Sequence, residues 1–168
     1  VGLAIGASLA VAGAVMQGVT RNPLADPFIL GVSSGASFAL VTAIYYFQLT
    51  KATEYVWFAF AGALAASTLV FLIGSAGRDG PTPVKLALAG VVVSAALSAW
   101  TSALLLLDEE TFDIVRFWLA GSVINRDMNT FFLMLPFLLG AAVACILLGH
   151  QLNVLSLGEE TAQSLGMR

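Results

Sequence analysis

The residues that could do chemistry are few, and the most suggestive group is the run from Gly31 to Gly35. Its sequence, Gly-Val-Ser-Ser-Gly, matches G-x-S-x-G, the pattern that presents a nucleophilic serine in many hydrolases. Such a serine needs a base, and His150 is the single histidine of the chain. An intramembrane serine protease that uses Ser33 and His150 is therefore one hypothesis. Against it, the pattern normally follows a strand, which the sequence does not predict here, and His150 also fits a helix-end residue favoured by the helix dipole.

The sequence lacks the residues that other kinds of catalytic or binding sites require. No G-x-x-x-x-G-K-[ST] phosphate loop occurs, and Lys51 and Lys85 are the only lysines. The His, Cys and carboxylate residues do not cluster at metal-ligand spacing, so the sequence predicts neither a metal site nor a cofactor. Cys145 is the single cysteine, which excludes an internal disulfide, and we interpret it as a small core residue. The net charge of −3, without a basic run, predicts no nucleic-acid partner.

The charged residues lie outside five long apolar stretches, and this pattern indicates the fold class. The stretches cover roughly 1–19, 28–50, 55–77, 86–107 and 128–149. About 20 apolar residues in a helix span the hydrocarbon core of a bilayer, whereas a soluble helix carries charges on its wet face. The sequence therefore predicts an all-α, multi-pass membrane protein. Because the stretches contain no ionisable residue of the kind that marks an ion path, a secondary carrier is a less favoured alternative.

Five spans place the connecting loops on alternate sides of the lipid bilayer. The loops near 20–27, 78–85 and 150–168 share one side and carry four basic residues, against three in the loops near 51–54 and 108–127. The positive-inside rule then favours the first set as cytoplasmic. The chain starts without Met and opens directly into an apolar helix, so we interpret it as a fragment of a longer membrane protein.

Small residues recur at four-residue spacing within the apolar stretches. They are Gly2 and Gly6, Gly31 and Gly35, Ala61 and Ala65, and the trio Gly90, Ser94 and Ser98. Such faces let helix backbones approach closely in lipid. The pattern predicts a compact helical bundle.

The segment from 111 to 123 is too short to span a bilayer. It carries Val115 and Trp118 at helical spacing, and Asp113 and Arg116 form an i,i+3 pair of opposite charge. We predict an interfacial helix at the outer surface. A solvated loop with aromatic anchors is the alternative.

A stiff polar turn is predicted between the first two stretches, on the cytoplasmic side. Residues 22–27 read Asn-Pro-Leu-Ala-Asp-Pro, and the two prolines fix the backbone in conformations that exclude a helix. On these residues alone, the turn could be no more than a connector.

The end of the chain carries the signals of a separate short helix. Ser156 and Glu159 form an S-x-x-E capping box, and Gly166 is placed as a C-cap. We therefore divide the chain into a transmembrane bundle, 1–150, and a cytoplasmic loop with a capped helix, 151–168. Such a helix either docks a soluble partner or is a plain loop helix.

Six short motifs together resemble the permease subunits of type II ABC importers, the FecCD-type family that takes up iron-siderophores, haem and vitamin B12. The motifs are Gly13–Gln17, Asn22–Pro27, Leu30–Ala36, Leu88–Val91, Trp118–Ser122 and Leu155–Gly166. They follow the family order and span nearly the whole chain. The resemblance implies five transmembrane helices, the second to the sixth of a bundle of about ten, followed by a cytoplasmic coupling helix.

The resemblance also implies partners. The family pairs two permease subunits, alike or different, with cytosolic ATPase subunits and an extracytoplasmic substrate-binding protein. The chain would then sit in the plasma (inner) membrane of a bacterium and catalyse no bond chemistry itself. It would pass an iron-siderophore, or a related chelate such as haem or cobalamin, by ATP-driven alternating access.

Site residues follow from the motifs that match. The coupling helix that would hold the ATPase comprises Ser156, Gly158, Glu159, Glu160, Thr161, Ala162, Leu165 and Gly166. The cytoplasmic gate would fall on Asn22, Leu24, Pro83 and Val84. The last two depart from the family pattern, which often has small polar residues there. Arg116 and Arg126 are the candidates for docking the binding protein, with interfacial anchoring as their alternative.

Overall fold

The chain folds into helices and turns. The computed structural model describes residues 1–20, 22–77, 80, 82–121 and 128–156, and these residues contain no strand. Their contacts divide the chain into two compact units: residues 1–27 with 123–168, called the first unit, and residues 28–122, called the second. Each unit is described by itself.

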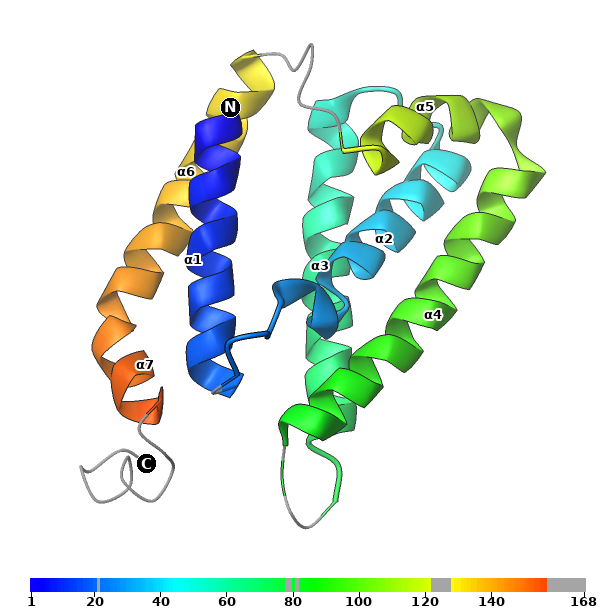
Figure 1. The fold of residues 1–168 in the computed structure, drawn as a ribbon. Coiled ribbons are helices and arrows are strands. Elements are labelled where there is room, and N and C mark those ends of the chain that lie inside the picture. The colour runs from blue at the N-terminus through cyan, green and yellow to red at the C-terminus, as the bar shows by residue number, and fades with distance from the viewer. Residues whose placement is uncertain (21, 78–79, 81, 122–127, 157–168) are drawn as a thin grey trace. The chain divides into compact units, whose positions relative to one another are not determined.

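The second unit is a bundle of four α-helices entered through a 3-10 turn. The turn η1 (Pro27–Leu30) leads to α2 (Val32–Phe47), and α3 (Ala52–Gly74), α4 (Pro83–Leu107) and α5 (Glu109–Leu119) follow. Helix α2 lies between α3 and α4, and α5 crosses the end of the bundle opposite the α3–α4 connection (Figure 1). Two groups of buried side chains form its core: Leu40, Val41, Ile44, Ala59, Leu104 and Val115, and separately Val70, Ala89 and Val93.

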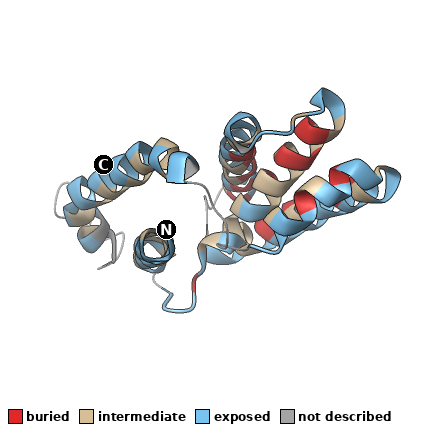
Figure 2. Cartoon of the chain, turned by 90° about the horizontal axis from the view of Figure 1, so that it is seen from above, coloured by how far each residue is buried: buried red, intermediate tan, exposed pale blue. Residues whose placement is uncertain are grey.

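The first unit contains α1 (Gly2–Thr20), α6 (Met128–Leu147) and α7 (Gly149–Ser156). Helix α1 contacts both α6 and α7. No residue of α1 is buried, whereas the facing sides of α2, α3 and α4 are (Figure 2). Pro136 lies inside α6, which a membrane helix tolerates because neighbouring groups satisfy the carbonyl that it frees.

The five apolar stretches all form helices, but three of them begin differently from the expectation. The third begins at Ala52, earlier than the predicted residue 55. The second stretch is interrupted at Gly31, whose left-handed backbone (φ 72°) separates η1 from α2. The fourth begins at Pro83, earlier than predicted, because Thr82 caps the helix by accepting from the Lys85 N–H (3.3 Å). Proline suits the first helical position, where no N–H is needed. Pro83 and Val84, predicted in a loop, are therefore the first turn of α4.

Three helices in the described part of the chain are long and apolar enough to cross a membrane. They are Gly2–Thr20, Thr53–Gly74 and Pro83–Leu107, and Val32–Phe47 and Phe131–Leu147 are shorter apolar helices. This agrees with the predicted multi-pass membrane protein.

Glycine contacts bring α2 and α3 together at backbone distance. A Cβ added at Gly35 would lie 2.4 Å from the Gly62 carbonyl oxygen and 2.3 Å from the Ala66 Cβ, so only hydrogen fits there. The predicted close-packing face at Gly35 is confirmed. Ala61 and Ala65, the other predicted small-residue face, are exposed, and the contact with α2 is made one residue later. Four-residue spacing occurs on both faces of α3, so spacing alone cannot select the one that meets α2.

Candidate functional site

The polar turn after α1 is an ordered structure organised by Asn22. The Asn22 N–H donates to the Gln17 carbonyl (3.3 Å), and the Ala25 N–H donates to the Asn22 carbonyl (3.0 Å). The Asn22 side-chain oxygen also accepts from the Leu24 N–H at 2.9 Å, which is the geometry of an Asx turn. Leu24, at the tip, is 86% exposed. The two gate residues predicted here thus have separate parts: Asn22 shapes the turn and Leu24 presents an apolar side chain.

The turn continues into η1, which rests directly on α4. A Cβ added at Gly90 would lie 1.8 Å from the Ile29 carbonyl oxygen, so the backbone of η1 occupies the place of a side chain on α4. The Gly31 N–H donates to the Phe28 carbonyl (3.0 Å) and closes the 3-10 turn. The left-handed backbone at Gly31 then redirects the chain into α2.

Two side-chain hydrogen bonds join α2 to α4 beyond this contact. The Ser34 hydroxyl lies 2.9 Å from the Ser94 hydroxyl and also within reach of the Gly31 carbonyl (3.1 Å). Further along, the Trp100 indole N–H donates to the Thr42 hydroxyl at 3.2 Å. Hydrogen bonds between membrane helices contribute about 0.6 kcal/mol on average. The α2–α4 seam therefore has a defined register as well as apolar packing.

This geometry removes the context that a serine nucleophile needs. Ser33 lies in the first turn of α2 and follows a 3-10 turn, whereas a nucleophile elbow follows a strand. The neighbouring Ser34 is engaged in helix packing. His150 lies in α7, in the other unit. The described residues thus explain the Gly31–Gly35 motif by a turn and close packing, without protease chemistry.

The other two predicted gate residues open α4. Val84 is exposed in its first turn. The Lys85 ammonium donates to the Gly80 carbonyl at 3.2 Å and so ties the helix start to the preceding loop. Asn22 and Leu24 belong to the first unit, and Pro83 and Val84 to the second.

Helix α5 confirms the predicted helix after the fourth span, and the loop alternative is wrong. It begins at Glu109 because Asp108 caps it, accepting from both the N–H (3.1 Å) and the hydroxyl of Thr111. Thr111 and Val115 are buried against the bundle. The outward face carries Arg116, paired with Asp113 at 3.2 Å, and the Arg116 guanidinium lies 4.8 Å from the centre of the Phe117 ring.

The cap of α5 should depend on pH. Hydrogen bonds from the Thr111 hydroxyl and then its N–H hold the pKa of the Asp108 carboxyl below its ordinary value. A lowered pKa in the folded state means that the cap stabilises α5 above the ordinary value, about 3.9, and that this stabilisation is lost as pH falls through the lowered pKa. Amide hydrogen exchange in the first turn of α5, corrected for intrinsic rates, should therefore accelerate as pH falls through the lowered pKa of Asp108. An Asp108→Asn variant, which caps without titrating, should lose this dependence; an unchanged profile would contradict the assignment.

The remaining predicted site residues lie largely outside the described residues. Ser156 is the last residue of α7. The rest of the predicted coupling helix, Gly158 to Gly166, lies outside the described residues, and so does Arg126.

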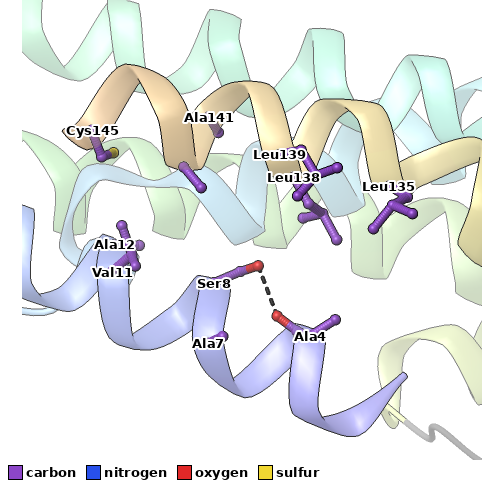
Figure 3. Close-up of a pocket in the computed structure, with 11 residues that line it drawn as sticks. Ala4, Ala7, Ser8, Val11, Ala12, Leu135, Leu138, Leu139, Ala141 and Cys145 are labelled. Carbon is purple, nitrogen blue, oxygen red and sulfur yellow. Dashed lines mark hydrogen bonds between the residues drawn. The ribbon is translucent and has the colours of Figure 1, made fainter. Parts of the chain in front are cut away.

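A cavity of about 280 Å³ opens between α1 and α6 within the first unit (Figure 3). Its walls include Ala4, Val11, Leu135 and Leu138, together with the Cys145 side chain. The Ser8 hydroxyl at its edge donates to the Ala4 carbonyl at 2.8 Å. Among the described residues, no group of His, Cys, Asp or Glu could hold a metal ion. The cavity is suited to apolar contact.

Comparison with known proteins accounts for these elements together. The model of the FecCD transport family matches residues 1–168. The chain belongs to the FecCD transport family. Its motifs at the turn, at Gly31–Gly35 and along α4 are therefore motifs of a FecCD protein, as the resemblance implied.

Named permease proteins are similar to almost the whole chain. The chain is 47% identical to the ferric enterobactin transport system permease protein FepD of Escherichia coli, and the match covers 99% of this chain and 50% of that protein. Identity to the probable siderophore transport system permease protein YfiZ of Bacillus subtilis is 42%, over 98% of this chain and 49% of the relative. The cobalamin import system permease protein BtuC of Halobacterium salinarum is 38% identical, over 99% and 44%. The chain thus spans about half the length of these relatives.

A solved structure shares the fold. It is described as a metal-chelate type ABC transporter in an inward-facing conformation, with a TM-score of 0.86 and 32% identity. The match covers 99% of this chain and 53% of the other. The all-helical membrane fold is therefore that of an ABC transporter permease.

Proposed function

We propose that this FecCD segment is part of the permease subunit of an ATP-binding-cassette importer in the plasma (inner) membrane. The observation that carries the proposal is the family match across all 168 residues, supported by relatives that are named permease proteins of import systems. The cargo is an iron-siderophore or a related metal chelate, the class named for several relatives. The segment contributes the path and its moving parts, and a separate cytosolic subunit hydrolyses ATP.

The mechanism is alternating access between the two sides of the membrane. The turn at Asn22 and Leu24 and the first turn of α4 at Pro83 and Val84 form the cytoplasmic gate. Support for the first comes from the ordered Asx turn, which holds Leu24 exposed at its tip. Support for the first turn of α4 comes from the Thr82 cap and from the hydrogen bond that the Lys85 ammonium donates to the Gly80 carbonyl. Both fix the start of the helix, where Val84 lies. Apolar side chains at both positions would exclude water when brought together.

The partners are a second permease subunit, a cytosolic ATPase and an extracytoplasmic binding protein. The ATPase binds the coupling helix, residues 156–166, whose capping box and acidic first turn suit a short, stable docking element. The binding protein docks at the outer surface, with Arg116 and Arg126 as contacts. Support for Arg116 comes from its exposure on α5, although its pairing with Asp113 lowers the charge that it presents.

A co-purification experiment tests the importer and the coupling site together. The full-length parent protein is co-expressed with its neighbouring ATPase and isolated through a tag on the permease. The wild type should retain the ATPase, and a variant with Gly158→Pro and Glu159→Arg should lose nearly all of it. The proline disfavours the helical backbone of the residue before it, and the second change removes the capping-box carboxylate and places a charge that opposes the helix dipole. Glu110→Arg on α5 is the matched control for charge reversal and should retain the ATPase.

Each outcome has a distinct meaning once equal membrane insertion is shown. A wild type that retains no ATPase, with uptake that persists without the ATPase gene, would contradict the importer and favour an ion-driven carrier. If the double variant binds ATPase as well as the wild type does, the coupling site is wrong and the importer stands. Uptake of a radiolabelled ferric siderophore by whole cells should fall with ATPase retention.

A further inference from the structure

The tryptophans and tyrosines of the chain all lie toward one end of the second unit. This end is the one that α5 crosses, opposite the α3–α4 connection (Figure 1). The six residues are Tyr45 and Tyr46 in the last turn of α2, Tyr55 and Trp57 in the first two turns of α3, Trp100 near the end of α4, and Trp118 on α5. The sequence places neither residue type toward the opposite end of the unit. Rings that carry a polar atom are therefore concentrated at one level of the bundle.

Three of these side chains hold this end of the bundle together. Tyr45, Tyr55 and Trp118 pack against the core group that contains Ile44 and Val115. They come from three different helices, so their contacts join α2, α3 and α5 at the level of the rings. Helix α5 is thus fixed at the aromatic end of the unit.

The other three side chains are exposed, one on each of α2, α3 and α4. Tyr46 is 61% exposed, Trp57 45% and Trp100 47%, and we call these residues the exposed aromatic trio. The Trp100 indole N–H donates to the Thr42 hydroxyl, and the Trp57 ring lies 6.3 Å from the Phe60 ring. Side chains of this kind, with an apolar ring and a polar atom, suit a boundary that is apolar on one side and wet on the other.

Two of the trio lie at the same distance from the opposite end of the unit. Trp57 is 17 residues before Gly74, the last residue of α3, and Trp100 is 17 residues after Pro83, the first residue of α4. At 1.5 Å per residue both distances are about 26 Å, close to the thickness of a hydrocarbon core, about 30 Å. Two antiparallel helices thus give the same level independently.

Charged residues begin just beyond this level. Lys51 and Glu54, at the start of α3, approach each other to 4.0 Å, and Asp108 to Glu110 follow the end of α4. Residues 55–74 and 86–107 contain no charge. Trp and Tyr are enriched where a membrane meets water, and charges are excluded from the core that follows. The order of residues along α3 and α4 is that of a path from water through the interface into the hydrocarbon.

Aromatic residues are also enriched at protein–protein interfaces, but there the strongest contacts cluster near the centre of one patch. The trio instead occupies three helices, at the level where the charged residues end and about one hydrocarbon thickness from the other end. A lipid interface accounts for the residue types, their level and the neighbouring charges together.

We propose that the exposed aromatic trio lies in the phospholipid headgroup layer and sets the depth at which the second unit sits in the membrane. Helix α5 then lies along the same layer. The proposal rests on membrane insertion and on neither the cargo nor the protein partners proposed above.

Tryptophan quenching by brominated phospholipids tests this in the full-length permease reconstituted in lipid vesicles. One variant keeps only Trp57 and another keeps only Trp100, with every other tryptophan of the full-length protein replaced by Phe. A third carries Tyr46→Trp without any other tryptophan. Each should be quenched more strongly by bromine near the headgroup than by bromine near the chain end.

The matched controls move the tryptophan along the same two helices. Leu64→Trp and Val92→Trp, in the tryptophan-free background, replace exposed residues about halfway to the opposite end of α3 and α4. Their quenching should show the reverse order, with the deep bromine more effective. All variants are compared once equal insertion and equal thermal midpoints are shown.

Three results would overturn the proposal. Stronger quenching of Trp57 or Trp100 by the deep bromine would place the trio inside the hydrocarbon. Quenching by aqueous acrylamide without quenching by either bromolipid would place it in water, as a surface for a protein partner. Absence of quenching by all three agents would show that the trio is covered by protein.

Discussion

Replacing Gly35 by alanine is expected to destabilise the second unit more than its single methyl group suggests. The new Cβ would lie 2.3 Å from the Ala66 Cβ and 2.4 Å from the Gly62 carbonyl oxygen. Because one of these atoms belongs to the backbone, no side-chain rotation relieves the clash, and α2 must move away from α3. Overpacking of this kind costs about 1–3 kcal/mol, occasionally more. The folded fraction and thermal midpoint of the full-length permease in detergent should both fall.

Two further variants show whether backbone contact is the cause. Gly140→Ala in α6 adds the same methyl group where nothing lies within 4 Å, and it should be neutral or slightly stabilising. Adding Ala66→Gly to Gly35→Ala removes one of the two clashes, so it should recover part of the loss and leave the clash with Gly62. Full recovery would show that the α2–α3 contact is made by side chains alone, contrary to this account.

The fold class could be predicted from the sequence because long stretches of it lack charged residues. A bilayer core excludes charged side chains at any position on a helix, so the signal needs no knowledge of the partner helix. The five apolar stretches could therefore be located. The helix at α5 carries charges and follows instead from the helical spacing of its apolar residues and from its i,i+3 pair of opposite charge. The start of α4 was misplaced because the cap at Thr82 and the proline after it are polar or loop-like in composition, although they belong to a helix start.

The packing partners could not be predicted in the same way. Gly90 and Ser94 were visible as a small-residue pattern, but their contacts, Ile29 and Ser34, lie on a segment about 60 residues away in the chain. Ala61 and Ala65 show the same spacing one residue before Gly62 and Ala66, so spacing alone does not select Gly62. Periodicity identifies candidate faces, whereas the choice between them depends on the neighbouring helix.

The site residues show the same division. The two prolines of residues 22–27 predicted a stiff turn, because proline restricts the backbone at its own position. The Asx turn at Asn22 confirms the turn. The role of Gly31 as a left-handed junction was masked by its place in a G-x-S-x-G pattern, which suggested a nucleophile. Gly31, followed by Val-Ser-Ser inside an apolar stretch, was the available signal for a helix break.

Replacing Gly90 by alanine should separate η1 from α4 and disturb the path of the chain into α2. The added Cβ would lie 1.8 Å from the Ile29 carbonyl oxygen, a backbone atom, so the turn has to lift away. Lifting η1 also stretches the hydroxyl contact between Ser34 and Ser94, now 2.9 Å. We expect a loss of about 1–3 kcal/mol of stability, measured as a lower midpoint of thermal unfolding.

The same variant should reduce uptake more than its loss of stability explains, if the turn at 22–27 acts as a gate. That turn ends at Pro27, the first residue of η1, so a displaced η1 moves the base on which the turn stands. Val91→Ala is the matched control, because Val91 is the next residue on α4 and is 66% exposed. Ser94→Ala removes only the hydroxyl contact and should cost about 0.6 kcal/mol. Normal stability of the Gly90→Ala variant would refute the close approach of η1 to α4. Lowered stability with normal uptake per folded protein would show that this contact stabilises the fold without affecting the gate.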